Sequence, residues 1–239
     1  MKYIFNFILI FMFNSALAAN DTVVLEKAYN EPDDKNSLQR GARNFMNYCS
    51  GCHSLEYIRY STIADGLGIS EEELMQNLMF NAAKPFEKVR SSMPPEQASK
   101  WFGVAPPDLT LMARAKGTDY IFTFLKGFYI DPNSPTGVDN VVLEGTSMPH
   151  VLWELQGLKR PSEGFTEEHS GDVDIEFLTT GKLSVEEYDQ FIRDTVNFLE
   201  YVSEPIRSTR RNLGFWVLMF LFFFLMLSYS LKKEIWKDV

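Results

Sequence analysis

Cys49-Ser50-Gly51-Cys52-His53 is the stretch that decides how this chain of 239 residues is organised. Two cysteines separated by two residues and followed at once by a histidine form the attachment pattern of a c-type haem. Each thiol can form a thioether with one edge of the porphyrin, and the adjacent histidine is placed to bind the iron from one side. The pattern predicts one covalently bound haem c, held by Cys49 and Cys52, with His53 as an iron ligand.

A cysteine pair with this spacing also occurs in zinc sites and in redox-active dithiols. A zinc site needs further soft ligands, but the chain has no other cysteine, and its remaining histidines are His150 and His169. A redox dithiol is typical of a βαβ setting, which the surrounding sequence does not indicate. Haem attachment is therefore the favoured interpretation.

Both ends of the chain carry apolar stretches. Residues 1–19 have a charged start, an apolar centre and small residues at a cleavage position, which indicates a signal peptide rather than a buried helix or an uncleaved anchor. Residues 213–231 contain no charge, and as a helix they would span about 28 Å, the thickness of a bilayer core. We expect a transmembrane anchor over residues 207–232 and a tail over residues 233–239.

Basic residues flank both ends of the anchor, so their count does not set its orientation. The signal peptide sets the orientation of the anchor, because it sends residues 20–206 across the membrane before the anchor stops transfer. The sequence thus predicts a single-pass protein of a bacterial inner membrane, with its haem domain in the periplasm and its C-terminus in the cytoplasm.

The exported domain is strongly acidic. Residues 20–206 contain 16 Lys and Arg against 30 Asp and Glu, a net charge of −14. This balance disfavours a nucleic-acid partner. It favours a basic protein partner, because complementary charge steers encounter, although solubility alone also accounts for it.

Two distant segments are expected to form packed helices. A helical run that we expect Asn36-Ser37 to cap leads into the haem motif and places Leu38, Gly41, Ala42 and Phe45 on one face. Gly41 lowers helix propensity, so we expect it to permit a close crossing with another element. The capping box Ser184-Val185-Glu186-Glu187 opens a second helix that ends near Pro205.

The segments between these helices are short. The patterns predict a helix capped by Ser70, mostly irregular chain over residues 81–107, a helix over residues 119–126, a loop over residues 131–137 and a β-hairpin around residues 173–178. The fold class is mainly α: a class I cytochrome c-like haem domain with long irregular insertions and a small β-hairpin, plus one C-terminal transmembrane helix.

The ligand on the other face of the iron separates the possible functions. A methionine indicates an electron carrier of raised potential, a histidine a lower potential, and an open position an enzyme or gas sensor. Met46 and Met75 lie in helical context and are expected in the core. Met148, in an irregular loop before a proline, is favoured on spacing, with Met93 and His150 as alternatives.

Four stretches resemble the cytochrome c1 family, the haem subunits of ubiquinol–cytochrome c reductase (complex III). They cover the chain from about residue 30 to its end, and the A-P-P-D-L…A-R block is the most specific of them. The stretches are residues 48–55 around the haem motif, residues 105–114 (APPDLTLMAR), residues 119–128, and Met148-Pro149 together with Ser203-Glu204-Pro205 and the anchor.

This resemblance implies roles for individual residues. Met148 stands at the family's sixth-ligand position, and His150 is then not a ligand. Arg114 would meet a haem propionate, which suits a guanidinium fork, although a surface ion pair is the other interpretation. Pro107 and Tyr120 would lie in the haem crevice.

The resemblance also implies a function: a one-electron carrier of the respiratory chain, passing electrons from the Rieske iron–sulfur subunit to a cytochrome c. The chain would not be an enzyme by itself. It would belong to a complex with a cytochrome b subunit, doubled into a dimer, that catalyses ubiquinol–cytochrome c oxidoreduction. An acidic segment would dock the cytochrome c: Glu163, Glu167, Glu168, Asp172, Asp174 and Glu176.

Two other functions compete with this one. The first is a membrane-anchored monohaem cytochrome of another electron-transfer chain, which the A-P-P-D-L…A-R block disfavours. The second is a haem peroxidase or gas sensor with an open iron, which a methionine ligand would exclude.

Overall fold

A computed structural model describes residues 23–161 and 175–237 of the protein. The expected signal peptide, residues 1–19, and all of the acidic segment except Glu176 lie outside these ranges. The helices are α2 (Lys35–Tyr48), α3 (Tyr60–Leu67), α4 (Glu71–Asn77), α5 (Pro95–Phe102), α6 (Met112–Lys116), α7 (Thr118–Lys126), α8 (Trp153–Gln156), α9 (Val185–Ser203) and α10 (Arg207–Ile235). The strands are β1 (Leu55–Arg59), β2 (Lys88–Val89), β3 (Phe128–Ile130), β4 (Val138–Asn140), β5 (Lys159–Pro161) and β6 (Ile175–Phe177).

The mainly α fold class is confirmed, and the strands in the described residues form only two-stranded antiparallel sheets. The region predicted as a hairpin, residues 173–178, contains β6, but its partner β5 lies outside that region, so that Glu176 lies opposite Arg160. The pairs β1–β2 and β3–β4 were not predicted. The loop expected over residues 131–137 connects β3 to β4.

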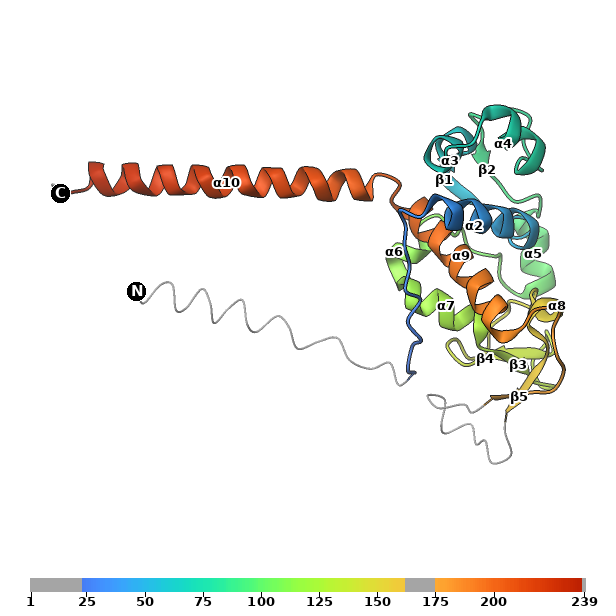
Figure 1. The fold of residues 1–239 in the computed structure, drawn as a ribbon. Coiled ribbons are helices and arrows are strands. Elements are labelled where there is room, and N and C mark those ends of the chain that lie inside the picture. The colour runs from blue at the N-terminus through green and yellow to red at the C-terminus, as the bar shows by residue number, and fades with distance from the viewer. Residues whose placement is uncertain (1–22, 162–174, 238–239) are drawn as a thin grey trace.

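Helices α2 and α9 cross at the centre of the haem domain (Figure 1). A Cβ atom at Gly41 would overlap the backbone carbonyl oxygen of Asp194 and lie 2.7 Å from the Cβ of Phe198. Next to this contact the rings of Phe45 and Phe198 pack with their centroids 5.9 Å apart. The close crossing predicted at Gly41 is therefore confirmed.

A buried carboxylate reinforces the crossing. Asp194, which is 3% exposed, accepts hydrogen bonds from Ser37 Oγ at 2.7 Å and from Arg40 Nε at 2.6 Å. A second Arg40 bond, from Nη2, reaches the other carboxylate oxygen at 2.9 Å. Because a buried carboxylate needs compensating partners, these bonds tie the first turns of α2 to the middle of α9.

The start of α2 differs from the prediction. Asp34, rather than Asn36-Ser37, caps the helix and accepts the N–H of Asn36 at 2.9 Å. A capping residue needs extended backbone, and Asn36 and Ser37 already lie in the first helical turn. The Ser37 hydroxyl serves the Asp194 contact instead. The capping boxes at Ser70 and Ser184 are both present as predicted.

Residues 81–107 are mostly irregular, as predicted, but they contain β2 and the helix α5, which begins at Pro95. A proline at the first helical position starts a helix rather than breaking one. One further expectation was wrong. Met75 is not a core residue: it is 45% exposed, whereas Met46 is 3% exposed. Met75 lies in the short helix α4, of which only Leu74 is buried.

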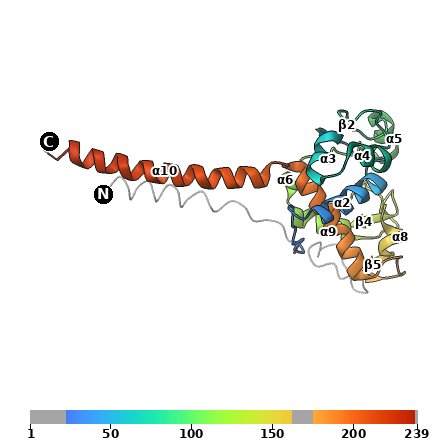
Figure 2. The same ribbon diagram turned by 45° about the horizontal axis from the view of Figure 1, so that its top comes forward.

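Helix α10 leaves the haem domain and projects away from it (Figures 1 and 2). In the part of the chain that the structure describes, it is the one helix long and apolar enough to cross a membrane, and none of its side chains is buried. Only Glu204, Pro205 and Ile206 separate it from α9. The helix that crosses α2 at Gly41 therefore also leads into the anchor.

The substitution Gly41→Ala tests the crossing. The added methyl group meets backbone rather than a flexible side chain, so the helices must separate. We expect a loss of about 1–3 kcal/mol or more in the free energy of unfolding. The measurement is the denaturant midpoint of the purified protein. The control is Arg43→Ala, an exposed position of the same helix, where a change under about 0.5 kcal/mol is expected. Equal midpoints for the two variants would contradict the role of Gly41.

Candidate functional site

The Cys49–His53 segment forms a tight turn directly after α2. The N–H groups of Cys49 and Ser50 both donate to the carbonyl of Phe45, at 2.8 and 3.0 Å. The N–H groups of Cys52 and His53 both donate to the carbonyl of Cys49, at 3.0 and 2.8 Å. These bonds hold the two cysteines and the histidine on one turn, as attachment to a single porphyrin edge requires.

The two thiols are free and do not form a disulfide. Burial in apolar surroundings raises the pKa of the Cys49 thiol to about 12 and also raises the pKa of Cys52. A redox-active dithiol has a lowered thiol pKa. The surroundings of these cysteines therefore differ from those of a thioredoxin-like pair.

The His53 ring is oriented by a residue 54 positions further along the chain. Its Nδ1 lies 2.8 Å from the carbonyl oxygen of Pro107. A carbonyl only accepts, so Nδ1 carries the hydrogen and Nε2 is left with a lone pair for a metal. Burial also lowers the pKa of His53, which favours the neutral, metal-binding form. A ligating histidine commonly has a backbone carbonyl as this second partner.

Asp108 positions the segment that carries the Pro107 carbonyl. One carboxylate oxygen accepts the N–H of Glu56 at 2.7 Å, and the other accepts the N–H of Thr110 at 2.9 Å. The first bond joins this segment to β1, directly after the haem motif. From the sequence alone, no role was predicted for Asp108 of the A-P-P-D-L block. The signal was an aspartate beside prolines, the pattern of a side chain that caps a turn.

Two serines, Ser54 and Ser91, form further hydrogen bonds that hold the motif. Ser91 Oγ donates to the carbonyl of Gly51 at 2.7 Å, and the Ser91 N–H donates to Ser54 Oγ at 2.9 Å. The Ser54 carbonyl in turn accepts the N–H of Leu109 at 2.9 Å. The haem motif is thus held from both sides by chain that is distant in sequence.

A buried aspartate organises the loop that carries Met148. Asp139, at 6% exposure, accepts the N–H groups of Gly145 and Thr146 at 3.1 and 3.3 Å. Thr146 Oγ1 then accepts the N–H of Met148 at 3.4 Å. Gly145 has a φ of 69°, a conformation that favours glycine. Sequence reasoning missed Asp139, because its partners lie across a loop without regular structure.

The three candidates for the sixth ligand have different surroundings. Met148 is half-buried and packs against the hydrophobic core, whereas Met93 is not part of that cluster. His150 is buried and stacks on Phe128 with ring centroids 4.9 Å apart. Burial and the nearby Lys159 lower the pKa of His150 to about 4, so its ring is neutral. Of the two candidate methionines, Met93 and Met148, only Met148 packs against the core.

The remaining predicted residues lie on α6 and α7. The Arg114 side chain is 65% exposed, and its guanidinium lies 4.0 Å from the Glu204 carboxylate. This contact is the surface ion pair that the sequence also allowed. Tyr120 is half-buried, packs against the core and stacks on Phe124, with ring centroids 6.4 Å apart.

These residues fit a covalently bound haem. Two free thiols lie on one turn, a neutral imidazole has its Nδ1 engaged so that Nε2 is available, and a loop methionine packs beside the core. Cys49 and Cys52 would hold the porphyrin, and His53 and Met148 are the donors suited to the iron.

Comparison with known proteins points to one family. The model described as "Cytochrome C1 family" matches residues 26–239. Cytochrome c1 of Allochromatium vinosum is 47% identical over 226 residues, covering 93% of each chain. The ammonia monooxygenase gamma subunit of Nitrosomonas europaea is 38% identical, covering 94% of this chain and 92% of that protein. Cytochrome c1 of Rhodospirillum rubrum is 26% identical, covering 86% and 83%.

The substitution Asp108→Asn tests the support of the motif. An amide has one acceptor oxygen in place of two, so either the Glu56 or the Thr110 N–H loses its bond and faces another donor. We expect a loss of about 1–3 kcal/mol in the free energy of unfolding, measured from the denaturant midpoint. The control is Asp131→Asn, a turn aspartate that accepts one N–H, from Asn133. Asparagine serves that turn equally well, so equal losses in both variants would show that Asp108 has no special role.

Proposed function

The chain belongs to the cytochrome c1 family, and from this membership we propose which of its residues bind the haem. It carries covalently attached haem c and transfers electrons as a membrane-anchored subunit of complex III, the ubiquinol–cytochrome c reductase. We propose that Cys49 and Cys52 would form the two thioethers, and that His53 and Met148 would be the protein ligands of the iron.

The hydrogen bond from His53 Nδ1 to the Pro107 carbonyl carries this assignment. It orients the ring, leaves Nε2 for the iron and makes the imidazole a stronger donor. When bound, the haem supplies the one-electron couple. The surrounding residues set its potential, because a thioether ligand and a water-poor pocket both favour the reduced iron.

Three further residues complete the proposed site. Pro107 acts through its carbonyl, and Tyr120 shields the crevice with its half-buried ring. Arg114 pairs with a haem propionate. Its guanidinium is 65% exposed, and its neighbour Glu204 is already engaged by two bonds from Arg210, so that Arg114 has freedom to turn.

The proposed route of the electron runs from the Rieske iron–sulfur subunit, through this haem, to a cytochrome c. A cytochrome b subunit would accompany the chain, and the whole complex would be a dimer. By itself the chain would not be an enzyme. The acidity of residues 20–206 supports a basic acceptor, although Glu176, the described part of the acidic segment, pairs with Arg160 at 2.6 Å.

We also propose the division of the chain. Residues 1–19 form a signal peptide, residues 20–206 the periplasmic haem domain, residues 207–232 the anchor in a bacterial inner membrane, and residues 233–239 a cytoplasmic tail. Helix α10 supports the anchor, because it begins at Arg207 and carries the uncharged stretch of residues 213–231. The proposed orientation of the anchor follows from the signal peptide.

The substitution Met148→Leu tests the sixth ligand. Removing the thioether should lower the haem potential by more than about 59 mV, a tenfold change for one electron, and should let the reduced protein bind carbon monoxide. A redox-titrated optical spectrum measures both. Met75→Leu is the matched control, because Met75 is an exposed methionine of α4. If Met148→Leu leaves the potential and the carbon monoxide response unchanged, another residue binds the iron.

Co-purification tests the assembly. An affinity tag on this chain should recover a cytochrome b subunit and a Rieske subunit from solubilised membranes. If subunits of a terminal oxidase or a monooxygenase are recovered instead, the chain is a monohaem cytochrome of a different electron-transfer chain.

Protease protection tests the orientation. In spheroplasts, an epitope tag added after Val239 should survive external protease while the haem domain is digested, because the tail would lie inside. Loss of the tag with the membrane intact would show that the C-terminus lies outside, contrary to the proposed topology. Tag loss after lysis serves as the control for protease activity.

A further inference from the structure

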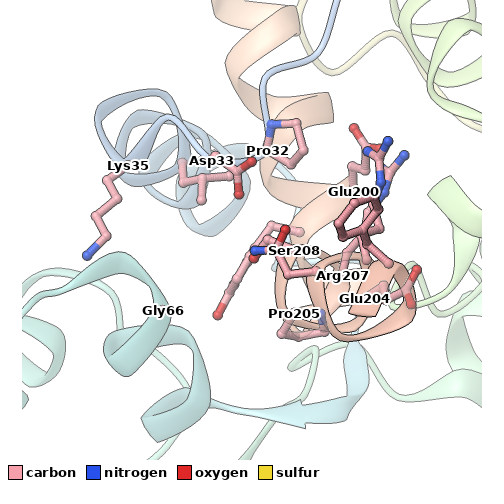
Figure 3. A pocket seen from close by; sticks show the side chains of 14 residues that line it. Pro32, Asp33, Lys35, Gly66, Glu200, Glu204, Pro205, Arg207 and Ser208 are labelled. Carbon is pink, nitrogen blue, oxygen red and sulfur yellow. The ribbon is translucent and has the colours of Figure 1, made fainter. Parts of the chain in front are cut away.

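A pocket of about 620 Å³ lies where the haem domain meets the anchor (Figure 3). Its walls come from the chain entering α2, from Gly66 of α3, from the end of α9 and from the first turns of α10. Figure 3 shows Lys35 on the α2 side and Ser208 on the α10 side, with Gly66 below. The pocket is separate from the haem motif, which follows the other end of α2.

Two of the cations in this pocket have no carboxylate partner. Glu200 pairs with Arg207, and Glu204 accepts bonds from Arg210 at 2.5 and 3.0 Å. Lys35 and Arg211 line the same pocket, are both exposed, and form no ion pair with any residue of the described ranges. The unpaired N–H groups at the start of α10 add positive potential there.

The rim also carries one carboxylate, Asp33, which is exposed and forms no ion pair within the described ranges. The pocket therefore presents two unpaired cations and one unpaired anion. This set suits a phosphodiester that also bears an amine, such as an ethanolamine headgroup, better than a simple dianion.

The position along α10 sets the depth of the pocket relative to the membrane. Arg211 precedes the uncharged stretch by two residues, which corresponds to about 3 Å along the helix axis. The pocket therefore lies at the level where phospholipid headgroups meet the hydrocarbon core.

One face of α10 joins the pocket to the apolar stretch. Arg207, Arg211 and Phe215 line the pocket at intervals of four residues, which places them on one side of the helix. The same spacing continues into the stretch with Met219, which is 51% exposed. A molecule with a charged head in the pocket could lay an apolar chain along this face.

We propose that this pocket binds the headgroup of a membrane phospholipid, with Lys35 and Arg211 holding its phosphodiester and the acyl chains lying along the Phe215 face of α10. A bound lipid there would fill the angle between the haem domain and the anchor. Its attachment points would come from α2 and α10 at once, so it would brace the haem domain against the membrane surface.

The test compares three forms of the detergent-solubilised complex by native mass spectrometry: wild type, the double variant Lys35→Gln with Arg211→Gln, and a control. The control, Arg43→Gln with Lys100→Gln, removes two exposed cations elsewhere. Wild type and control should each retain one phospholipid per chain that the double variant loses. On titration with phosphatidylethanolamine in mixed micelles, affinity should fall about tenfold for each cation removed.

Four results would overturn the proposal. Equal phospholipid counts in all three forms exclude the site. Displacement of the lipid by millimolar inorganic phosphate indicates a soluble anion instead. Loss of a membrane subunit without loss of lipid indicates a protein contact. Equal loss of lipid in the control indicates a nonspecific charge effect.

A folding control distinguishes loss of lipid binding from loss of folding. The Arg211 side chain forms no ion pair or hydrogen bond in the described ranges, so the single variant Arg211→Gln removes neither kind of interaction there. Its haem content per chain should equal that of wild type. The variant Arg211→Lys, which retains the charge, should keep most of the lipid. Failure of Arg211→Lys and Arg211→Gln to differ would also count against the site.

Discussion

The close contact between Gly41 and the backbone of Asp194 is the constraint on which the rest of the structure depends. A glycine at this point brings the backbones of α2 and α9 together, and the Asp194 carboxylate then bonds to Ser37 and Arg40. The haem motif continues from one of these helices and the membrane anchor follows the other. The crossing therefore links the proposed haem site to the anchor helix, and an electron relay between bound and mobile partners needs such a link.

Each side of the proposed iron site is held by an aspartate that binds backbone N–H groups. Asp108 fixes the segment whose carbonyl orients His53, and Asp139 fixes the loop that carries Met148. Irregular chain needs such acceptors, because its N–H groups have no helix or sheet partner. In the A-P-P-D-L block, Pro107 presents the carbonyl and Asp108 holds the segment that carries it in place.

The junction between the domain and the anchor has a different chemistry. Glu200 and Glu204 pair with neighbouring arginines, whereas Lys35, Arg211 and Asp33 form no ion pair among the described residues, although residues 20–206 have a net negative charge. We propose that the cations at this junction hold lipid phosphate, and the net negative charge of residues 20–206 favours a basic acceptor. Complementary charge of this kind steers a partner toward one face.

The sequence by itself determined the haem motif, the anchor, both capping boxes, the helix over residues 119–126 and the need for a close crossing at Gly41, because each depends on neighbouring residues or on one helical period. It did not determine the cap at Asp34, the helix at Pro95, the exposure of Met75 or the strand pairs β1–β2 and β3–β4. Tertiary structure alone also decided what supports the site. Pro107 reaches His53 and Asp108 reaches Glu56 across more than fifty residues, and such contacts depend on how distant segments pack rather than on any local pattern.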